Sequence, residues 1–571
     1  MLTLTVDRDA PIPMRDGVLL SADIYRPAGP GPYPTVLTRT PYDKATRGPT
    51  PLVVRLASAG YAVVVQDTRG RYASEGAFVP FVHERDDGFD TLEWLVAQPW
   101  CDGKIGMYGG SYVGLTQWQT AMSGHPALKA IVPNVTASNY HNGWAYQGGA
   151  FELGFNLSWA ISVLSIDTAL KAHGRDMTAE EIQELFDGID AQTESFARLP
   201  LRGHEILRRY AAYYDDWLDH PHYDEFWESL DVSRAYAAID VAALNIGGWY
   251  DIFLSGTLEN FTGMRAVSAD PSRQRLMVGP WNHGGMQGGN PIGRIDFGIR
   301  STGAIIDDGG MHQRWYDRWL RDEDNGIADE PPVRVFVMGA GRWRTSEDWP
   351  LPETDFQDWY FHSDGRANGL GGDGTLSRDE PGDEPPDSYL YNPRNPVPTV
   401  GGPLCCNAVF TLGGAYDQRV VEQREDVLVY TSAPLEHDIE VAGPLKVVLH
   451  AASTAPDTDF TAKLVDVEPC GFARNLNDGI IRARYRRSMR EPEPIVPGEV
   501  MEYEIDLVGT SNLFRAGHRI RVEISSSNFP RFDRNPNTGE SAADATTLAS
   551  AMQTIHHARW APSRIVLPVV G

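Results

Sequence analysis

Cysteine and long apolar runs are scarce in this chain of 571 residues. It has four cysteines, and no spacing among them matches a zinc site. So few cysteines in a long chain are typical of a reducing compartment. A disulfide between the neighbours Cys405 and Cys406 would be strained, so we expect free thiols. The N-terminus has no signal-peptide core and no run approaches the length of a membrane span, so we expect a cytoplasmic protein.

Positive charge is also in short supply. Aspartate and glutamate number 77 against 50 lysines and arginines, which gives a formal net charge of −27. Such a surface repels phosphate backbones and anionic lipids, so we expect neither nucleic acid nor membrane as a partner. The G-x-G-x-x-G, Walker and H-E-x-x-H patterns are missing too, so we expect no nucleotide cofactor and no bound metal. The oligomeric state stays open, with a homodimer among the alternatives.

The chain does contain enough apolar material for several cores, and its length predicts about two to four domains. Residues 1–140 and 241–350 alternate short β-branched apolar runs with helix-like segments, a pattern typical of a mostly parallel sheet covered by helices. Residues 141–240 differ, because a capping box at 178–181 opens a run of apolar residues at helical spacing. This segment predicts a helical cap inserted into the α/β domain.

The pattern changes again over residues 351–571. The stretch 364–387 is rich in Gly, Asp and Pro and predicts a linker or a long loop. Apolar and charged residues then alternate strictly at 502–507 and at 519–524, which predicts half-buried antiparallel strands. We therefore expect a C-terminal β-sandwich after the α/β domain.

Ser111 lies in a glycine-rich turn between a strand-like run and a helix-compatible one. Glycines on both sides permit a sharp strand-to-helix turn that lifts the hydroxyl clear of the sheet. The same turn aims the N–H of Tyr112 at the place where an oxyanion would form. The common elbow is G-x-S-x-G, whereas here the second glycine comes one place later, as G-x-S-x-x-G. Taken alone, the motif could equally be an ordinary Gly/Ser turn.

Two later segments change that balance. Residues 244–254 and 275–284 are each an apolar run that stops at a glycine and is followed by one ionisable residue, Asp251 and His283 respectively. Catalytic groups of open α/β sheets collect just past the carboxyl ends of strands. For either residue alone, a loop cap or an ordinary histidine would be the simpler interpretation. Together with Ser111 they follow the α/β-hydrolase order of nucleophile, acid and base, so we predict a Ser111–Asp251–His283 triad.

With these residues in place, the chain resembles the cocaine esterase and X-Pro dipeptidyl-peptidase-like family of serine hydrolases, with the cocaine-esterase branch nearest. The family also includes α-amino acid ester hydrolases and some β-lactam acylases. The resemblance covers nearly the whole chain. It implies an α/β-hydrolase domain, a helical cap and a C-terminal jelly roll, with the family's triad falling on the three residues already named. It rests on the triad segments and on residues 13–18, 39–44, 66–76, 98–103 and 527–535.

The resemblance also implies a second oxyanion donor and an acyl pocket. Tyr42 follows a strand-like run and Pro41, and its phenol is protonated at neutral pH and can donate. In the family a tyrosine of this Pro-Tyr-Asp motif meets the oxyanion; a packing role is the alternative. Phe253 lies two residues past the acid, and in cocaine-esterase-like members two tryptophans matching Trp144 and Trp159 wall an aromatic acyl pocket. The alternative is that this aromatic-rich insert only packs its own core.

The chain departs from the cocaine-esterase branch in two places. Residues 45–50 are shorter than their counterpart, which helps to seat the alcohol portion there, so cocaine itself is in doubt as a substrate. Residues 404–406, with Cys406 as the expected pocket residue, stand where that branch lines the pocket with larger apolar residues. We therefore expect a pocket that is roomier or differently shaped.

Other polar residues are given structural interpretations. We expect Asp67 and Arg69 to form an ionic staple of the active-site loops. We interpret His83 and Glu84 as a solvated turn, and the pair at 556–557 as surface or loop residues.

The leading hypothesis for function is a serine esterase that cleaves small carboxylic esters with an aromatic or bulky apolar acyl group through an acyl-enzyme. One alternative is an amide-bond hydrolase of the same family, of the X-Pro dipeptidyl-peptidase, α-amino acid ester hydrolase or β-lactam acylase type. Another is a carbohydrate- or partner-binding protein with an inert hydrolase domain, against which an intact triad argues.

Overall fold

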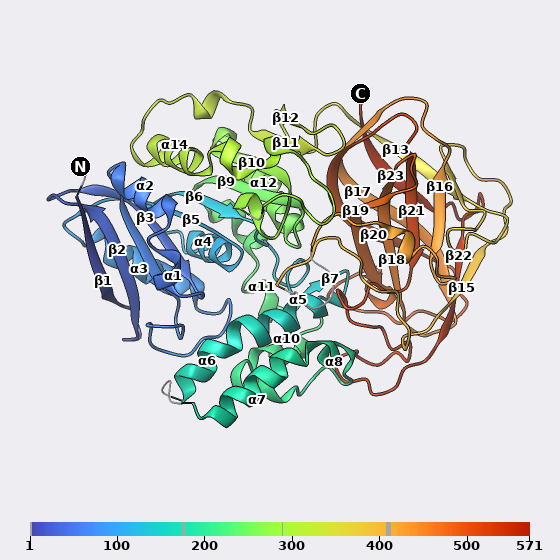
Figure 1. Cartoon of the computed structure of the whole chain (residues 1–571), viewed down its shortest axis with the longest axis horizontal. Coiled ribbons are helices and arrows are strands. Elements are labelled where there is room, and N and C mark those ends of the chain that lie inside the picture. Colours follow the sequence, from blue (N-terminus) through green and yellow to red (C-terminus); the bar gives the residue numbers. More distant parts are fainter. Residues whose placement is uncertain (1–2, 174–176, 288, 407–412) are drawn as a thin grey trace.

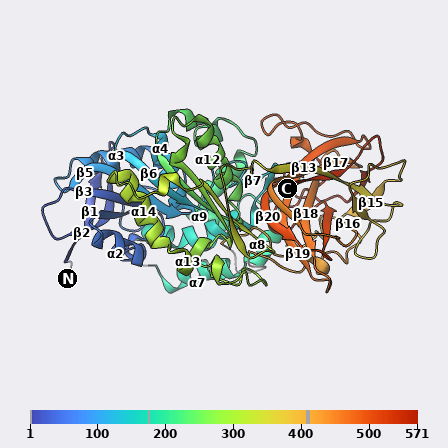
Figure 2. The same ribbon diagram turned by 90° about the horizontal axis from the view of Figure 1, so that it is seen from above.

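The computed structural model describes residues 3–173, 177–287, 289–406 and 413–571. Figure 1 shows an α/β body that carries the N-terminus and a β-rich body that carries the C-terminus, with a group of helices beneath the α/β body. The view from above shows the same two bodies end to end along the longest axis (Figure 2).

A ten-stranded sheet forms the centre of the α/β body, in the order β1-β2-β4-β3-β5-β6-β9-β10-β11-β12. The strands from β4 to β11 pair in parallel, and antiparallel strands flank them at both edges. The predicted, mostly parallel sheet is therefore confirmed. Its strands are β1 (Leu4–Pro13), β2 (Leu19–Pro27), β3 (Tyr33–Thr40), β4 (Ala62–Asp67), β5 (Cys101–Gly110), β6 (Leu128–Asn134), β9 (Ala242–Tyr250), β10 (Gln274–Asn282), β11 (Val333–Val337) and β12 (Arg342–Ser346).

Helices cover both faces of this sheet. Strand β4 shows why, because Ala62 and Val64 belong to one buried cluster and Val63 and Val65 to another. Successive side chains of a strand point to opposite faces, so an unbroken apolar run requires cover on both. Helices α3 and α4 contribute to the first cluster, and α2 and α14 to the second. The helices of this body are α1 (Lys44–Arg47), α2 (Pro51–Ser58), α3 (Glu84–Val96), α4 (Tyr112–Met122), α12 (Leu254–Val267), α13 (Gly303–Ile306) and α14 (Asp308–Leu320).

The chain between β6 and β9 is mainly helical, as the sequence predicts. The capping box forms: the Thr178 hydroxyl accepts the N–H of Glu181, whose carboxylate accepts the N–H of Thr178. The segment holds β7 (Tyr146–Gln147), β8 (Ala150–Phe151), α5 (Leu153–Ser158), a π-helical turn η1 (Trp159–Leu164), α6 (Ser165–Ala172), α7 (Ala179–Asp190), α8 (Gln192–Ala197), α9 (Glu205–Tyr210), α10 (Tyr213–Asp219) and α11 (Glu225–Glu228).

One helical stretch in this segment is longer than the sequence analysis expects. Leu153–Ala172 runs for 20 residues and is apolar enough to cross a membrane by length and composition. However, 72% of its most apolar window is buried inside the protein, as in the core helix of a globular domain.

The C-terminal body is built on an eleven-stranded sheet. In β20 the predicted alternation is confirmed, since Tyr503, Ile505 and Leu507 are buried while Glu502 and Glu504 are exposed. The strands are β13 (Thr354–His362), β14 (Thr375–Ser377), β15 (Asp387–Tyr391), β16 (Leu428–Ser432), β17 (Ile439–Ser453), β18 (Asp459–Val467), β19 (Ala473–Arg482), β20 (Met501–Phe514), β21 (Arg519–Ser525), β22 (Ala551–His556) and β23 (Arg564–Val570).

One expectation for polar residues of this body is wrong and another holds only in part. Strand β21 is buried on both faces, because Arg521 pairs with Glu422 at 2.6 Å on the face predicted to meet solvent. His557 lies in the loop just past β22, as the surface-or-loop interpretation allows, but it is fully buried against Asp387, with 3.0 Å between Nε2 and Oδ2. In both cases an ionic partner from a distant segment makes burial of the polar group tolerable.

Candidate active site

Ser111 occupies the turn between β5 and α4. Its backbone has φ 62° and ψ −128°, a conformation that a residue with a side chain rarely adopts. Two glycines make the turn possible. A Cβ on Gly109, where φ is 139°, would lie 2.2 Å from a methyl carbon of Val113. A Cβ on Gly114 would lie 2.7 Å from the Cβ of Thr136, so the glycine one place late in the motif is required by packing.

Asp251 and His283 follow the neighbouring parallel strands β9 and β10. The carboxylate of Asp251 lies 2.7 Å from His283 Nδ1, and His283 Nε2 lies 2.9 Å from the hydroxyl oxygen of Ser111. The Asp251 side chain is fully buried, whereas 15% of the His283 side chain is exposed. A carboxylate at Nδ1 holds the ring proton there, which leaves Nε2 free to accept the serine proton. The structure thus brings the three predicted residues into one hydrogen-bonded chain.

Tyr42 lies beside Ser111. Its hydroxyl accepts the indole N–H of Trp159 at 3.1 Å, so the phenol proton is left to point elsewhere. Desolvation raises the pKa of the Tyr42 phenol, opposed by its hydrogen bonds with Trp159 and Ser111. The phenol is therefore neutral beside Ser111, and its role as an oxyanion donor stays a prediction.

Tyr112 is the first residue of α4, where a backbone N–H has no partner within the helix. Its side chain is buried and anchored from two sides. The hydroxyl donates to a carboxylate oxygen of Glu84 at 2.9 Å and accepts the N–H of Phe81 at 2.9 Å. This arrangement fixes the start of the helix beside Ser111.

Glu84 is a supporting residue that the sequence analysis missed. Rather than lying in a solvated turn, it is 3% exposed and its Oε2 lies 3.0 Å from Nη1 of the fully buried Arg39. Burial raises the pKa of the Glu84 carboxyl, and the Arg39 charge opposes that shift. An arginine within the apolar strand β3 was the available signal, because a buried guanidinium requires an acceptor.

The loop that carries Tyr42 is tied to the sheet by buried charge. Asp67 accepts the N–H of Lys44 at 2.7 Å, and burial raises the pKa of its carboxyl to about 6. Arg69 lies 2.6 Å from Asp87 and 2.7 Å from Asp16. The ion pairs of Arg69 agree with the expected ionic staple, whereas Asp67 contributes hydrogen bonds to the backbone N–H groups of Lys44 and Ala73 instead.

Aromatic rings lie next to His283. The Phe253 ring meets His283 edge-on with 5.1 Å between centroids, and it stacks on Trp144 at 4.3 Å. Trp144 packs in turn against Trp159 at 5.4 Å. Each of the three aromatic side chains is 1% exposed or less. The structure therefore brings the three predicted pocket aromatics together at the triad, in contact with the helical segment's own core.

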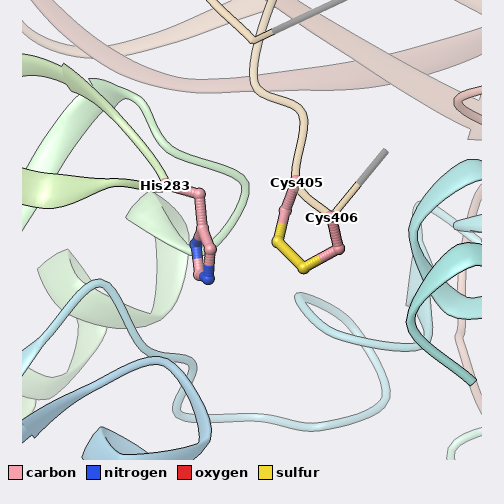
Figure 3. A group of neighbouring side chains, drawn as sticks. All are labelled: His283, Cys405 and Cys406. Carbon is pink, nitrogen blue, oxygen red and sulfur yellow. A yellow bond between two sulfur atoms is a disulfide. The ribbon is translucent and has the colours of Figure 1, made fainter. Parts of the chain in front are cut away.

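Cys406 and its neighbour Cys405 also reach the site, but not as free thiols. The two residues form a disulfide, so that expectation is wrong. The backbone turns at Cys406, where φ is 61°, and Figure 3 shows both sulfur atoms on the side that faces the His283 ring. Among the residues that the structure describes, Cys101 and Cys470 form no disulfide.

A serine, a histidine and an aspartate hydrogen-bonded in this order at the strand ends of an α/β sheet define a serine hydrolase of the α/β-hydrolase type. Known proteins agree with that class. Residues 16–285 match the family model of X-Pro dipeptidyl-peptidase (S15 family), and residues 325–566 match that of the X-Pro dipeptidyl-peptidase C-terminal non-catalytic domain.

The chain is 42% identical over 569 residues to cocaine esterase of Rhodococcus sp. (strain MB1 Bresler), covering 98% of this chain and 97% of that one. Two solved structures align over almost the full length. One is an aminopeptidase from a marine sediment archaeon, with a TM-score of 0.83, 28% identity and coverage of 100% and 97% of the two chains. The other is an α-amino acid ester hydrolase, with a TM-score of 0.82, 26% identity and coverage of 99% and 96%.

The chain belongs to the S15 family of X-Pro dipeptidyl-peptidase-like serine hydrolases, which includes cocaine esterase. It is an ester-hydrolysing serine enzyme with an α/β-hydrolase-type domain and a separate C-terminal domain rich in β-strands.

Proposed function

We propose that this enzyme cleaves small carboxylic esters with an aromatic or bulky apolar acyl group through a covalent acyl-enzyme. The hydrogen-bonded chain from Ser111 through His283 to Asp251 carries this proposal. His283 Nε2 takes the hydroxyl proton as Ser111 attacks the ester carbonyl, and the imidazolium then gives that proton to the departing alkoxide. Asp251 stabilises the imidazolium. A water molecule activated by the same nitrogen then releases the acid and restores the serine.

Two donors stabilise the negative oxygen of each tetrahedral intermediate. We assign one to the backbone N–H of Tyr112 and the other to the hydroxyl of Tyr42. The first lies at the N-terminus of α4, where the helix dipole also favours negative charge. The second carries a proton that its contact with Trp159 leaves free. Donors fixed in advance cost no reorganisation as the charge develops.

The acyl group is proposed to lie against Trp144, Trp159, Phe253 and the sulfurs at Cys406. Support comes from the contact of this aromatic group with His283 and from the apolar character of its rings. Two carboxylates that could bind an α-amine lie in a cavity next to Asp251 instead. Glu152 and Asp478 share a cavity with Asp251, and both pair with Arg531 there. This pairing favours the ester hypothesis over the aminoacyl alternative of the same family.

Finer features of the organisation stay predictions. They are the jelly-roll topology of the C-terminal body, the role of residues 141–240 as a cap, the boundaries near 140, 240 and 350, and the cytoplasmic location. A homodimer also stays an open prediction.

A substrate panel tests the proposal. p-Nitrophenyl esters with acetyl, butyryl and benzoyl groups should show kcat/KM rising with apolar acyl size, and Trp144→Ala should remove that preference. Trp560→Ala is the matched control, because this tryptophan is 64% exposed. Aminoacyl-proline anilides turned over faster than any of the esters would contradict the proposal and support the amide-hydrolase alternative.

A further inference from the structure

The disulfide beside His283 lies on a loop that is hydrogen-bonded to the residue before this histidine. Asn282, the residue before His283, donates its side-chain N–H to the carbonyl oxygen of Gly413 at 3.1 Å. Gly413 packs closely against Leu404, since a Cβ on Gly413 would lie 2.7 Å from the carbonyl oxygen of Leu404. Cys405, which follows Leu404, is 7% exposed and belongs to the apolar cluster that contains the helical segment. These contacts hold the two sulfurs against the imidazole.

The ring and the two sulfurs together form a set of metal donors. One ring nitrogen of His283 and the sulfurs of Cys405 and Cys406 all lie within 4.8 Å of one another. Figure 3 shows the sulfurs between the loop and the ring, facing the imidazole. A tetrahedral zinc ion holds thiolates at about 2.3 Å and imidazole nitrogen at about 2.0–2.1 Å, which places its ligand atoms roughly 3.5–4 Å apart. In the disulfide the two sulfurs are bonded to each other, so they can take up this spacing around one ion only after reduction separates them.

We propose that Cys405 and Cys406, once reduced, bind a thiophilic divalent cation such as Zn²⁺ or Cd²⁺ together with Nε2 of His283, and that this binding switches the enzyme off. Nδ1 is already engaged by Asp251, so Nε2 is the nitrogen available to the ion. A carboxylate on the other ring nitrogen is the usual partner of a metal-binding histidine. Sulfur and imidazole ligands select zinc-like ions over magnesium or calcium.

The chemistry has two balanced steps. A thiol reductant cleaves the disulfide by exchange: two reductant thiols become one reductant disulfide, and the two cysteines each gain a hydrogen. The cation then displaces both thiol protons and binds two thiolates and one neutral imidazole, with release of two protons. With its lone pair on the metal, Nε2 can no longer take the proton of Ser111. The disulfide form offers no thiolates, so it should bind the ion weakly and stay active.

The inhibitory effect depends on the proposed role of His283 in ester hydrolysis, whereas metal binding does not, so the two are measured separately. One sample of the enzyme is kept oxidised and another is reduced with a water-soluble phosphine. The phosphine takes up the oxygen of one water molecule as it converts the disulfide to two thiols. Cd²⁺ is the probe. Binding is followed by thiolate-to-cadmium charge-transfer absorption and by protons released, and activity by hydrolysis of a p-nitrophenyl ester. Each rate is compared with that of the same sample without cadmium.

Reduced enzyme should bind one Cd²⁺ with release of two protons, and cadmium should inhibit it at a concentration at least about 100-fold lower than it inhibits oxidised enzyme. Reduced Cys405→Ser/Cys406→Ser should lose the absorption and the tight inhibition. Reduced Cys470→Ser, which alters an exposed cysteine, should behave as wild type. His283→Ala should keep the absorption but bind cadmium at least about tenfold more weakly, because losing a ligand costs no less than losing one of its outer-shell partners.

Equal inhibition of the reduced and oxidised forms, or of the double variant, would overturn the site. Unchanged cadmium affinity in His283→Ala would remove the histidine from it. Cadmium binding of the expected kind in a chain without esterase activity would leave the metal site standing and reject the proposed function.

Discussion

Replacing Tyr42 by phenylalanine removes one hydroxyl and keeps the ring. That hydroxyl accepts the Trp159 N–H at 3.1 Å and hydrogen-bonds with Ser111, and in the proposed mechanism its proton meets the oxyanion. Loss of one oxyanion donor typically costs about 3 kcal/mol of transition-state stabilisation, or a factor of 10²–10³ in kcat. KM for a p-nitrophenyl ester should change little, because the oxyanion exists only near the transition state.

The same substitution leaves the indole N–H of Trp159 without its acceptor, which should lower the free energy of unfolding by about 1–3 kcal/mol. Tyr61→Phe is the control, because it removes a tyrosine hydroxyl that donates to Asp317 at 2.6 Å, away from Ser111. It should lower stability comparably and leave kcat unchanged. A Tyr42→Phe enzyme with unchanged kcat would refute the assignment, and an increase in KM alone would make Tyr42 a substrate-packing residue.

Three further predictions concern the triad and its support. Asp251→Asn and His283→Ala should each lower kcat by several orders of magnitude. Adding Ser111→Ala to either variant should lower kcat little further, because triad members act as a unit. Losses that multiply in steady-state kinetics would contradict this prediction. Glu84→Gln leaves a buried guanidinium unpaired and should lower the free energy of unfolding by about 3–5 kcal/mol in urea titrations, against no more than about 1 kcal/mol for an exposed glutamate. Burial raises the pKa of Glu152 from 4.5 to about 7. Between these two pH values the folded state keeps a proton that the unfolded state has lost. The contribution of Glu152 to the free energy of unfolding should therefore fall as pH rises from 4.5 to 7. Glu152→Gln should flatten that part of the pH–stability curve, and an unchanged slope would show that the carboxyl does not titrate there.

Much of the site can be predicted because its signals are local. Gly109 and Gly114 surround Ser111 in the sequence and are also the residues whose missing Cβ atoms permit the turn. Asp251 and His283 each follow an apolar run, and parallel strands bring the ends of such runs to one edge of a sheet. No long-range information is needed to propose that these three residues meet.

The failures at charged residues share a different origin, because each depends on a partner far away in the chain. Glu84, the first residue of helix α3, is buried because Arg39, on strand β3, faces it. Arg521 is buried because Glu422 covers the face of β21 that alternation assigns to solvent. Charge patterns along one segment do not show which opposite charge folds over it.

Cys405 and Cys406 are a local failure. The general strain of a disulfide between neighbours argues for free thiols, yet the structure joins the two sulfurs where the chain turns at Cys406. The sequence alone also gives no distance from this pair to His283, which lies more than a hundred residues earlier and in the other body of the protein.

Titration with a fluorophosphonate, which reacts with an activated serine, tests the central claim most directly. The account predicts one label per chain, found by mass spectrometry on the peptide that contains Ser111, with esterase activity lost in proportion to labelling. Ser111→Ala should remain folded, take up no label and lose on the order of 10⁶ in rate. Labelling of another residue, or a Ser111→Ala enzyme within about tenfold of the wild-type rate, would contradict the account.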